Sequence, residues 1–269
     1  MVAIFGLLTD FGEKDPYRGQ LASVLLRRRP SCQILDLTHQ VDPHNILQGA
    51  FFLRASWPWL PRGCIILGVV DPGVGSSRDI VLFRSGEGYV LAPDNGVLEL
   101  MLRDVSPDGL WRLRSDRFNG ASFTFHGRDV FAPLAADLAE GAEPDRLGER
   151  LSVQDLFRIP FAEAGLEEDR IEARVLHVDR FGNCVLNIPE SAWDDTIREG
   201  EDAELVKPAG LSVAAVRAYS AIPAGSAGIL PGSQGYLELA LDRTSCAEHL
   251  GLKIGDRVVL RLQALTGVS

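Results

Sequence analysis

The sequence predicts two domains: an N-terminal α/β domain with a mostly parallel sheet flanked by helices, and a C-terminal all-β domain that forms a small barrel. Two observations predict this fold class. Apolar strands alternate with amphipathic helices as far as about residue 150, whereas only short strands dominate beyond residue 170. With 269 residues, of which 46% are hydrophobic, the chain is long enough for two cores. We expect domains at 1–155 and 170–269, joined by a linker at 156–169.

The N-terminal domain is predicted to begin with a strand, an acidic loop and a helix. The apolar run Val2–Thr9 has the length of a strand and ends at Asp10, and apolar residues recur at helical spacing over Gln20–Arg29. The pattern then repeats, with strands predicted at Gln33–Leu37, Cys64–Val70 and Gly88–Ala92 and helices at Asn45–Ser56 and Val97–Leu102. Strands that alternate with helices pair in parallel, so their carboxyl ends share one edge of the sheet.

The third predicted strand ends at Asp71, which is followed by a Pro-Gly turn and then by Arg78. Pro72 fixes one φ angle, while Gly73 and Gly75 permit positive φ and let a ligand approach the main chain closely. In open α/β sheets ligands bind in the crevice beyond the carboxyl ends of the strands, so we expect a reacting group at Asp71. The alternative is a structural turn with an Asp-Arg pair on the surface.

A second polar patch includes His126 and Asp129 and precedes an apolar helix. Asp129 is predicted to cap a helix over Val130–Ala139. His126 would then lie just before a helix N-terminus, where the backbone N–H groups favour an anion and disfavour a protonated imidazole. A loop histidine that bonds to a neighbour is the alternative interpretation.

Beyond residue 170 the pattern is one of short strands and turns, which predicts a small barrel. The predicted strands are Ile171–Val175, Cys184–Ile188, Ala203–Val206, Ser212–Tyr219, Gly228–Leu230, Tyr236–Leu241 and Arg257–Leu262. One short helix is predicted at Cys246–Leu250, with Ser245 as its cap.

Composition narrows the range of partners. A formal net charge of −10 argues against a nucleic-acid surface, because phosphate binding needs clustered Lys and Arg. No apolar run reaches the roughly 18 residues of a membrane span, and the N-terminus resembles no leader segment. The four cysteines form no Cys-x-x-Cys pair and are interpreted as buried, reduced thiols. We therefore expect a cytoplasmic protein that binds neither nucleic acid nor membrane.

The motifs exclude several kinds of chemistry. No zinc-binding spacing of His and Cys is present, which disfavours a zinc site and leaves a two-metal phosphatase as a weak alternative. There is no Gly-x-Ser-x-Gly element, and Gly73-Val74-Gly75 lacks the third glycine of a dinucleotide fingerprint. Carboxylates at strand ends suit ribose hydroxyls and an ammonium or sulfonium group better than phosphates.

Six motifs, taken together, resemble the S-adenosyl-L-methionine (SAM) hydroxide adenosyltransferase family, to which the fluorinases and chlorinases are related. They are Leu8–Gly12 with Asp15 and Tyr17, Asp71–Gly75, Pro93–Gly96, Thr124–Asp129, Phe181–Asn183 and Gly232–Tyr236. They span nearly the whole chain in the family's order. The resemblance implies a homotrimer with active sites between the N-terminal domain of one subunit and the C-terminal domain of the next. It also implies hydrolysis of SAM by attack of water or hydroxide at C5′, which gives adenosine and methionine.

The resemblance also implies roles for individual residues. The family's water-activating Asp, Arg and His fall on Asp71, Arg78 and His126. The substrate-binding positions fall on Asp10 for the ribose, on Asp15 and Tyr17 in the following loop, and on Asp179, Phe181, Asn183 and Ser233 in the C-terminal domain. Tyr219 stacks on adenine in one interpretation and belongs to the barrel core in the other. The chain departs from the family pattern over Asp242–Ala247. It also departs at His44, the position at which related halogenases carry tryptophan.

The reaction that the resemblance implies needs neither a metal nor a cofactor, because the sulfonium leaves as a neutral thioether. The enzyme must supply a positioned and partly deprotonated water, and either Asp71 or His126 takes its proton. We keep two alternatives: a chloride- or fluoride-using adenosyl halogenase, and a sensor that binds SAM or adenosine without turnover. An intact Asp-Arg-His set favours water as the nucleophile.

Overall fold

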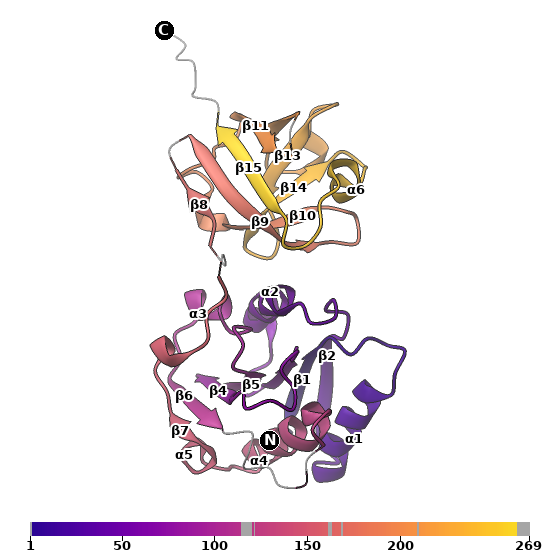
Figure 1. Cartoon of the computed structure of the whole chain (residues 1–269), viewed down its shortest axis with the longest axis vertical. Helices are drawn as coiled ribbons and strands as arrows, with labels where there is room; N and C mark the ends of the chain where they lie inside the picture. Colours follow the sequence, from indigo (N-terminus) through magenta and orange to yellow (C-terminus); the bar gives the residue numbers. More distant parts are fainter. Residues whose placement is uncertain are drawn as a thin grey trace. The chain divides into compact units, whose positions relative to one another are not determined.

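The computed structural model describes residues 2–113, 120, 122–160, 163–167, 169–208 and 210–262. The chain divides into two compact units, residues 1–160 and 161–269, and each has a sheet of its own (Figure 1). The first unit is an α/β structure and the second is a β-barrel, so the predicted fold class is confirmed. No helix in the described part of the chain has the length and apolar character needed to cross a membrane.

The sheet of the first unit has seven strands in the order β2-β1-β3-β5-β4-β6-β7. Their bounds are β1 Ile4–Thr9, β2 Gln33–Thr38, β3 Ile65–Val69, β4 Ile80–Ser85, β5 Gly88–Pro93, β6 Gly109–Leu113 and β7 Glu149–Arg150. β2, β1, β3 and β5 pair in parallel, as the alternating pattern predicts. β4, β6 and β7 extend the sheet by antiparallel pairing, so the sheet is mixed.

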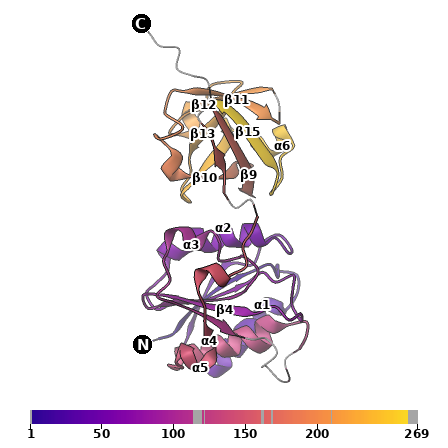
Figure 2. The same cartoon turned by 60° about the vertical axis from the view of Figure 1, so that its left-hand side comes forward.

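Helices cover both faces of this sheet (Figure 2). Their bounds are α1 Tyr17–Arg28, α2 Ile46–Ser56, α3 Met101–Asp104, α4 Ala132–Ala139 and α5 Pro144–Leu147, with short turns η1 at Trp57–Trp59 and η4 at Val153–Asp155. Leu21 of α1 and Leu134 of α4 pack into one core, whereas Leu53 of α2 and Met101 of α3 pack into the other. β3 is buried along its whole length between these layers, which explains its unbroken apolar sequence.

Two local predictions in this unit are wrong. The predicted helix Val97–Leu102 is a turn that leads into the short α3. Asp129 does not cap a helix, because the helix begins earlier, with the π-helical turn η3 at Gly127–Phe131, which continues directly into α4. The Asp129 carboxylate instead accepts a hydrogen bond from Ser122 N at 3.0 Å and pairs with Arg128. His126 does lie at the N-terminal end of this helical segment, as predicted.

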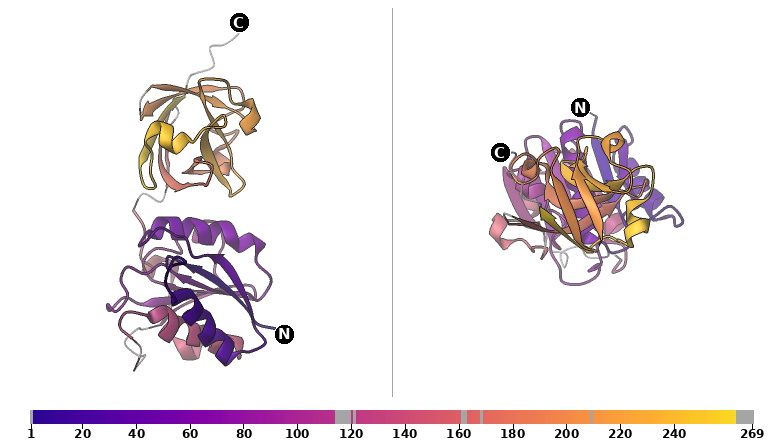
Figure 3. Two further views of the ribbon diagram at one scale, coloured as in Figure 1. Left: turned by 90° about the vertical axis from the view of Figure 1, so that its right-hand side faces the viewer. Right: turned by 90° about the horizontal axis from the view of Figure 1, so that it is seen from above.

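The second unit is a barrel with the strand order β10-β14-β13-β12-β11-β15-β9, closed by pairing of β10 with β9 and extended by β8 (Figure 3). The bounds are β8 Gly165–Leu166, β9 Arg170–Val178, β10 Cys184–Pro189, β11 Asp202–Lys207, β12 Leu211–Ala215, β13 Ala227–Pro231, β14 Tyr236–Leu241 and β15 Arg257–Leu262, with α6 at Cys246–Leu250 and turns η5 at Glu190–Ala192 and η6 at Tyr219–Ala221. Ser245 caps α6 by accepting from Glu248 N, as predicted. The predicted strand Ser212–Tyr219 ends at Ala215, so Tyr219 lies outside the barrel strands.

Candidate active site

The side chains of Asp71, Arg78 and His126 meet at the carboxyl end of β3. Arg78 Nε donates to Asp71 Oδ1 at 2.9 Å, and Arg78 Nη2 pairs with Asp71 Oδ2. The same Nη2 lies 3.1 Å from Nδ1 of His126. The side chains of Asp71 and Arg78 are only 5% and 10% exposed, and His126 is 6% exposed. The three residues predicted to form the catalytic set therefore form one buried cluster.

The loop between β3 and β4 folds Arg78 back onto Asp71. Val74 N donates to Asp71 O at 3.2 Å, and Ser76 N donates to Gly73 O at 3.1 Å, so the loop makes two successive turns. The hydroxyl of Ser76 also donates to Gly73 O at 2.6 Å. These bonds turn the chain back toward the end of β3 before β4 begins, which allows the guanidinium to face the carboxylate in a two-bonded fork.

Gly75 lets this loop approach the segment that carries His126. Its φ is +79°, and a Cβ placed on it would lie 2.3 Å from the carbonyl oxygen of Phe123. No other residue type fits such a backbone-to-backbone approach at this φ. The close packing of the two loops brings His126 within reach of Arg78.

The chemistry of the donor fixes the protonation of His126. A guanidinium can only donate, so Nδ1 of His126 accepts the bond from Arg78, and the neutral imidazole carries its proton on Nε2. Burial, followed by the charge of Arg78, lowers the pKa of His126 below its ordinary value, against the opposing effects of Asp71 and Asp129. His126 is therefore neutral near pH 7, with an N–H group available to donate.

One nitrogen of the Arg78 guanidinium takes no part in these bonds. Its Nη1 is buried and has no hydrogen-bond partner in the part of the chain that the structure describes. A buried guanidinium nitrogen without an acceptor is costly, so a site of this kind favours an oxygen or an anion placed against it.

Asp10 lies at the same edge of the sheet as Asp71. Thr9 pairs with Val69 in the parallel register of β1 and β3, so both carboxylates follow adjacent strand ends. Oδ2 of Asp10 accepts from the backbone N of His44 at 3.0 Å. His44 contributes through its backbone, which adopts φ 67°.

The loop after Asp10 joins the site through aromatic contacts. The ring of Tyr17 makes edge contacts with Phe125 and Phe11, at centroid distances of 5.2 and 6.0 Å, and is 44% exposed. Phe125 immediately precedes His126, so Tyr17 packs against the segment that carries the imidazole. Asp15 is exposed and, together with Asp36, lines a separate cavity of about 410 Å³.

The predicted residues of the barrel unit lie in two turns. Asp179 accepts from Phe181 N and Asn183 N, both at 2.8 Å, and from Asn183 Nδ2 at 2.9 Å. This arrangement leaves the Phe181 ring 79% exposed. Ala247 N donates to Gly182 O at 2.9 Å, so the segment that departs from the family pattern contacts this turn. Ser233 is exposed in the loop before β14.

Glu238 belongs to this part of the barrel unit and was not predicted from the sequence. It is buried on β14 and accepts from the hydroxyl of Tyr219 at 2.5 Å. Burial and the charge of Asp179 raise the pKa of Glu238, against the opposing hydrogen bond from Tyr219. Tyr219 is 47% exposed, which excludes the barrel-core interpretation. A single carboxylate within the apolar run Tyr236–Leu241 was the signal available in the sequence.

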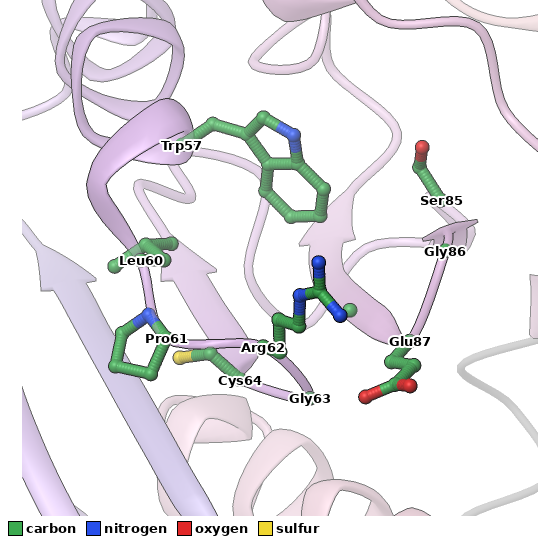
Figure 4. A pocket seen from close by; sticks show the side chains of 10 residues that line it. Trp57, Leu60, Pro61, Arg62, Gly63, Cys64, Ser85, Gly86 and Glu87 are labelled. Carbon is green, nitrogen blue, oxygen red and sulfur yellow. The ribbon is translucent and has the colours of Figure 1, made fainter.

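A further cavity of about 410 Å³ lies at the opposite edge of the first sheet (Figure 4). Trp57, Arg62 and Glu87 form part of its lining, as does Cys64, which directly precedes β3. Asp71 follows β3, so roughly 17 Å of strand separates this cavity from the cluster. Among the described residues, no group of three or more His, Cys, Asp or Glu side chains is arranged to hold a metal ion.

Comparisons with known proteins cover both units. The family model of the SAM hydroxide adenosyltransferase N-terminal domain matches residues 5–148, and that of its C-terminal domain matches residues 173–259. An (R)-S-adenosyl-L-methionine hydrolase from Thermus thermophilus is 37% identical over 262 residues, which is 94% of this chain and 97% of the relative. A protein of the same name from Salinispora tropica is 33% identical over 93% of this chain and 94% of the relative. A fluorinase from Actinopolyspora mzabensis is more distant, at 23% identity over 95% of this chain and 96% of the fluorinase.

Two crystal structures resemble the whole chain. An uncharacterized conserved protein from Thermotoga maritima gives a TM-score of 0.83 at 30% identity and covers 96% of this chain and 99% of that one. A conserved hypothetical protein from Thermus thermophilus gives 0.77 at 35% identity, with 98% and 100% covered. Given both family models and relatives of this identity and coverage, the chain belongs to the SAM hydroxide adenosyltransferase family.

Proposed function

We propose that this protein hydrolyses SAM to adenosine and L-methionine. The observation that carries the proposal is the buried cluster of Asp71, Arg78 and His126. It occurs in a chain of this family whose relatives named (R)-S-adenosyl-L-methionine hydrolase include one that is 37% identical. The cluster offers an acceptor for a proton, a fixed positive charge and an N–H donor, which are the groups that a water nucleophile needs.

The proposed reaction balances without a further reactant. The oxygen of water forms a bond to C5′ as the bond from C5′ to sulfur breaks, and the electron pair of that bond goes to sulfur. The sulfonium becomes the neutral thioether of methionine, and water loses one proton. No acid is needed for the leaving group, so the proposal includes neither metal nor cofactor. Alignment of the water with the breaking bond supplies much of the acceleration.

The hydrogen-bond directions divide the roles within the cluster. Nδ1 of His126 is occupied by Arg78, so Asp71 is the residue that accepts the proton of water. In the neutral imidazole the one acceptor nitrogen is Nδ1, which already accepts from Arg78. His126 therefore donates from Nε2–H and orients the water. Arg78 offers its buried Nη1 to the charge that develops on the oxygen.

The remaining predicted residues bind the substrate in this proposal. Asp10 accepts from the ribose hydroxyls, and Asp15 and Tyr17 help to hold the substrate in the loop that follows. The barrel residues Asp179, Phe181, Asn183, Ser233 and Tyr219 contact the methionine and adenine portions. The edge-on packing of Tyr17 against Phe125 supports its assignment.

We also propose a homotrimer in which the N-terminal domain of one subunit and the C-terminal domain of the next form each active site. Support comes from the division of the binding residues between two units that each have their own core. A cytoplasmic location is part of the same proposal, and the four unpaired cysteines are compatible with it.

The direct test is a product assay. Purified protein is incubated with SAM, and the products are separated by chromatography beside the variant His126→Ala. We expect equal amounts of adenosine and methionine from the wild type and a much slower reaction from the variant. Intact SAM after long incubation at high enzyme concentration would refute hydrolysis.

A second candidate is halide transfer from the same site. The buried Nη1 of Arg78 is a donor that suits a halide anion as well as an oxygen. The adjacent Asp71 carboxylate repels an anion, however, which favours water. Adding chloride or fluoride to the same assay distinguishes the two, because only the halogenase produces a 5′-halo-adenosine.

A further inference from the structure

A second buried histidine lies near the candidate site without belonging to the Asp71 cluster. His39 follows β2 and is 3% exposed. Its Nδ1 is 2.8 Å from Oγ1 of Thr9, the last residue of β1, and its Nε2 is 2.9 Å from Oδ1 of Asp36. The other carboxylate oxygen of Asp36 pairs with Arg18. These four side chains form a continuous chain of contacts from the surface to the strand end.

With the His39 imidazole neutral, the chemistry of its partners gives the direction of each bond in this chain. The Asp36 carboxylate can only accept, so Nε2 of His39 carries the proton in the neutral imidazole. Nδ1 is then an acceptor, and the Thr9 hydroxyl must donate to it. The Thr9 oxygen in turn accepts from the backbone N of Phe11 at 3.3 Å. Every polar atom between Phe11 and Asp36 thus has a defined role.

The chain of bonds ends in the loop that follows Asp10. Phe11 N is held by Thr9, and Gly12 N donates to the carbonyl oxygen of His39 at 2.8 Å. Gly12 has φ +67°, and the space around its Cβ position is open, so the glycine serves the backbone conformation rather than close packing. His39 therefore restrains both residues after Asp10. Its ring bonds to Thr9, which accepts from Phe11 N, and its backbone carbonyl accepts from Gly12 N.

We propose that His39 is a positioning residue for substrate binding, which acts through Thr9 and the backbone of Phe11 and Gly12 to hold Asp10 where the ribose binds. This role rests on the proposed function, because it assumes that Asp10 binds the substrate. Asp36 and Arg18 anchor the outer end of the arrangement. Among the residues that the structure describes, the His39 side chain bonds to Thr9 and Asp36 and not to Asp71, Arg78 or His126, so its effect falls on binding rather than on the chemical step.

The test compares Thr9→Val with Thr9→Ser. Valine keeps the shape of threonine in this fully buried position but removes the hydroxyl, whereas serine keeps the hydroxyl. We expect Thr9→Val to raise the KM for SAM about tenfold while kcat changes less than about twofold, and Thr9→Ser to keep both near the wild-type values. A purely structural role would lower the Tm of Thr9→Val without this split between KM and kcat.

Amide hydrogen exchange provides a readout that does not depend on activity. Exchange in the segment that contains Phe11 and Gly12 should be faster in Thr9→Val and unchanged in Thr9→Ser. If the wild type does not hydrolyse SAM, the proposed function fails while the exchange result still decides whether the loop is held in this way. Asp36→Asn, which keeps an acceptor for His39 but loses the ion pair with Arg18, is the second variant and should show a smaller KM increase. Wild-type KM and wild-type exchange in folded Thr9→Val would overturn the proposal.

Discussion

At the residue scale, the cluster depends on the division of its bonds around one guanidinium. Arg78 is held on one side by both oxygens of Asp71 and contacts His126 through Nη2. A change in either partner therefore alters the charge or the orientation of the other. Separate predictions for Asp71 and His126 follow from this arrangement.

Asp71→Asn should lower kcat by roughly 10²- to 10⁴-fold, because an amide has the shape of the carboxylate but is a much weaker proton acceptor. The matched control is Asp79→Asn. Asp79 lies next to Arg78 in the sequence but pairs with Arg112 at 3.0 Å, so its loss should leave kcat within about twofold. Steady-state kinetics with SAM measures both, and equal effects of the two variants would contradict the assignment of Asp71.

The lowered pKa of His126 predicts that kcat/KM falls at acid pH. Because burial and Arg78 lower its pKa below the ordinary 6.5, it is neutral at pH 7 and becomes protonated only as the pH falls through that lowered value. Protonation places an N–H against the guanidinium and breaks their contact, so kcat/KM should fall with a midpoint below pH 6.5. The unfolded state takes up this proton first, so acid also lowers the free energy of unfolding.

His126→Asn is the control for the acid limb. The asparagine oxygen takes the place of Nδ1 as an acceptor for Arg78, but it does not titrate. The variant should therefore be slower than the wild type and lack the fall in kcat/KM that protonation of His126 causes. Persistence of the same limb in the variant would assign it to another group.

The sequence identified the residues that carry motifs and missed those defined only by contacts. Asp71, Arg78 and His126 come together in the structure as predicted from the motif resemblance. The pairing of Thr9 with His39, 30 positions away, and that of Tyr219 with Glu238 were not predicted. Such contacts depend on strand register and loop conformation, which residue patterns along the chain do not encode.

At the element scale, Gly75 is the point where two loops meet, which predicts the effect of a single added methyl group. Gly75→Ala places a Cβ 2.3 Å from Phe123 O at a φ of +79°. The loops must then separate, which moves Arg78 away from His126. We expect a loss of about 2 kcal/mol or more in the free energy of unfolding and at least a tenfold lower kcat.

Gly86→Ala isolates the cost of the backbone conformation. Gly86 has φ +57° in the turn between β4 and β5, and nothing lies within 4 Å of its Cβ position. The substitution should cost about 1 kcal/mol and leave kcat unchanged. Denaturant unfolding and the SAM assay measure both variants, and similar kcat values for the two would show that the approach at Gly75 is dispensable.

The sequence predicted the parallel half of the first sheet better than its antiparallel half. β1, β2, β3 and β5 are apolar runs followed by polar loops, and they were all predicted near their observed bounds. β4 is joined to β5 by a tight turn at Gly86 rather than by a helix, so the alternating pattern did not reveal it. The start of η3 was also missed, because Asp129 has the residue type of a helix cap although it contacts the loop before the helix.

At the scale of the whole molecule, the change from strands and helices to strands alone predicted two kinds of unit. The cores confirm it, since Leu21 and Leu134 pack in one unit while Ile171 and Leu239 pack in the other. The sequence alone does not determine how the binding residues of the two units are combined, because a single chain and a symmetric assembly use the same residues. The proposed trimer makes this arrangement testable.

Two inactive variants should complement each other if each active site combines two subunits. Asp71→Asn disables the N-terminal half of a site, and Asp179→Ala removes the carboxylate that holds the barrel turn of Phe181 and Asn183. In a trimer with sites between neighbouring subunits, a site is intact when its N-terminal domain comes from an Asp179→Ala subunit and its C-terminal domain comes from an Asp71→Asn subunit. Random assembly of equal amounts makes about one quarter of the sites intact.

The two variants are co-expressed with different tags, and mixed assemblies are purified through both tags in turn. Because this selection removes pure assemblies of either kind and every mixed trimer has one intact site, the SAM hydrolysis rate should reach about one third of the wild-type rate per subunit, far above that of either variant alone. The control is a mixture of Asp71→Asn with a differently tagged Asp71→Asn chain, which should stay inactive because every N-terminal half is disabled. Mixed assemblies as inactive as this control would place each site within one chain.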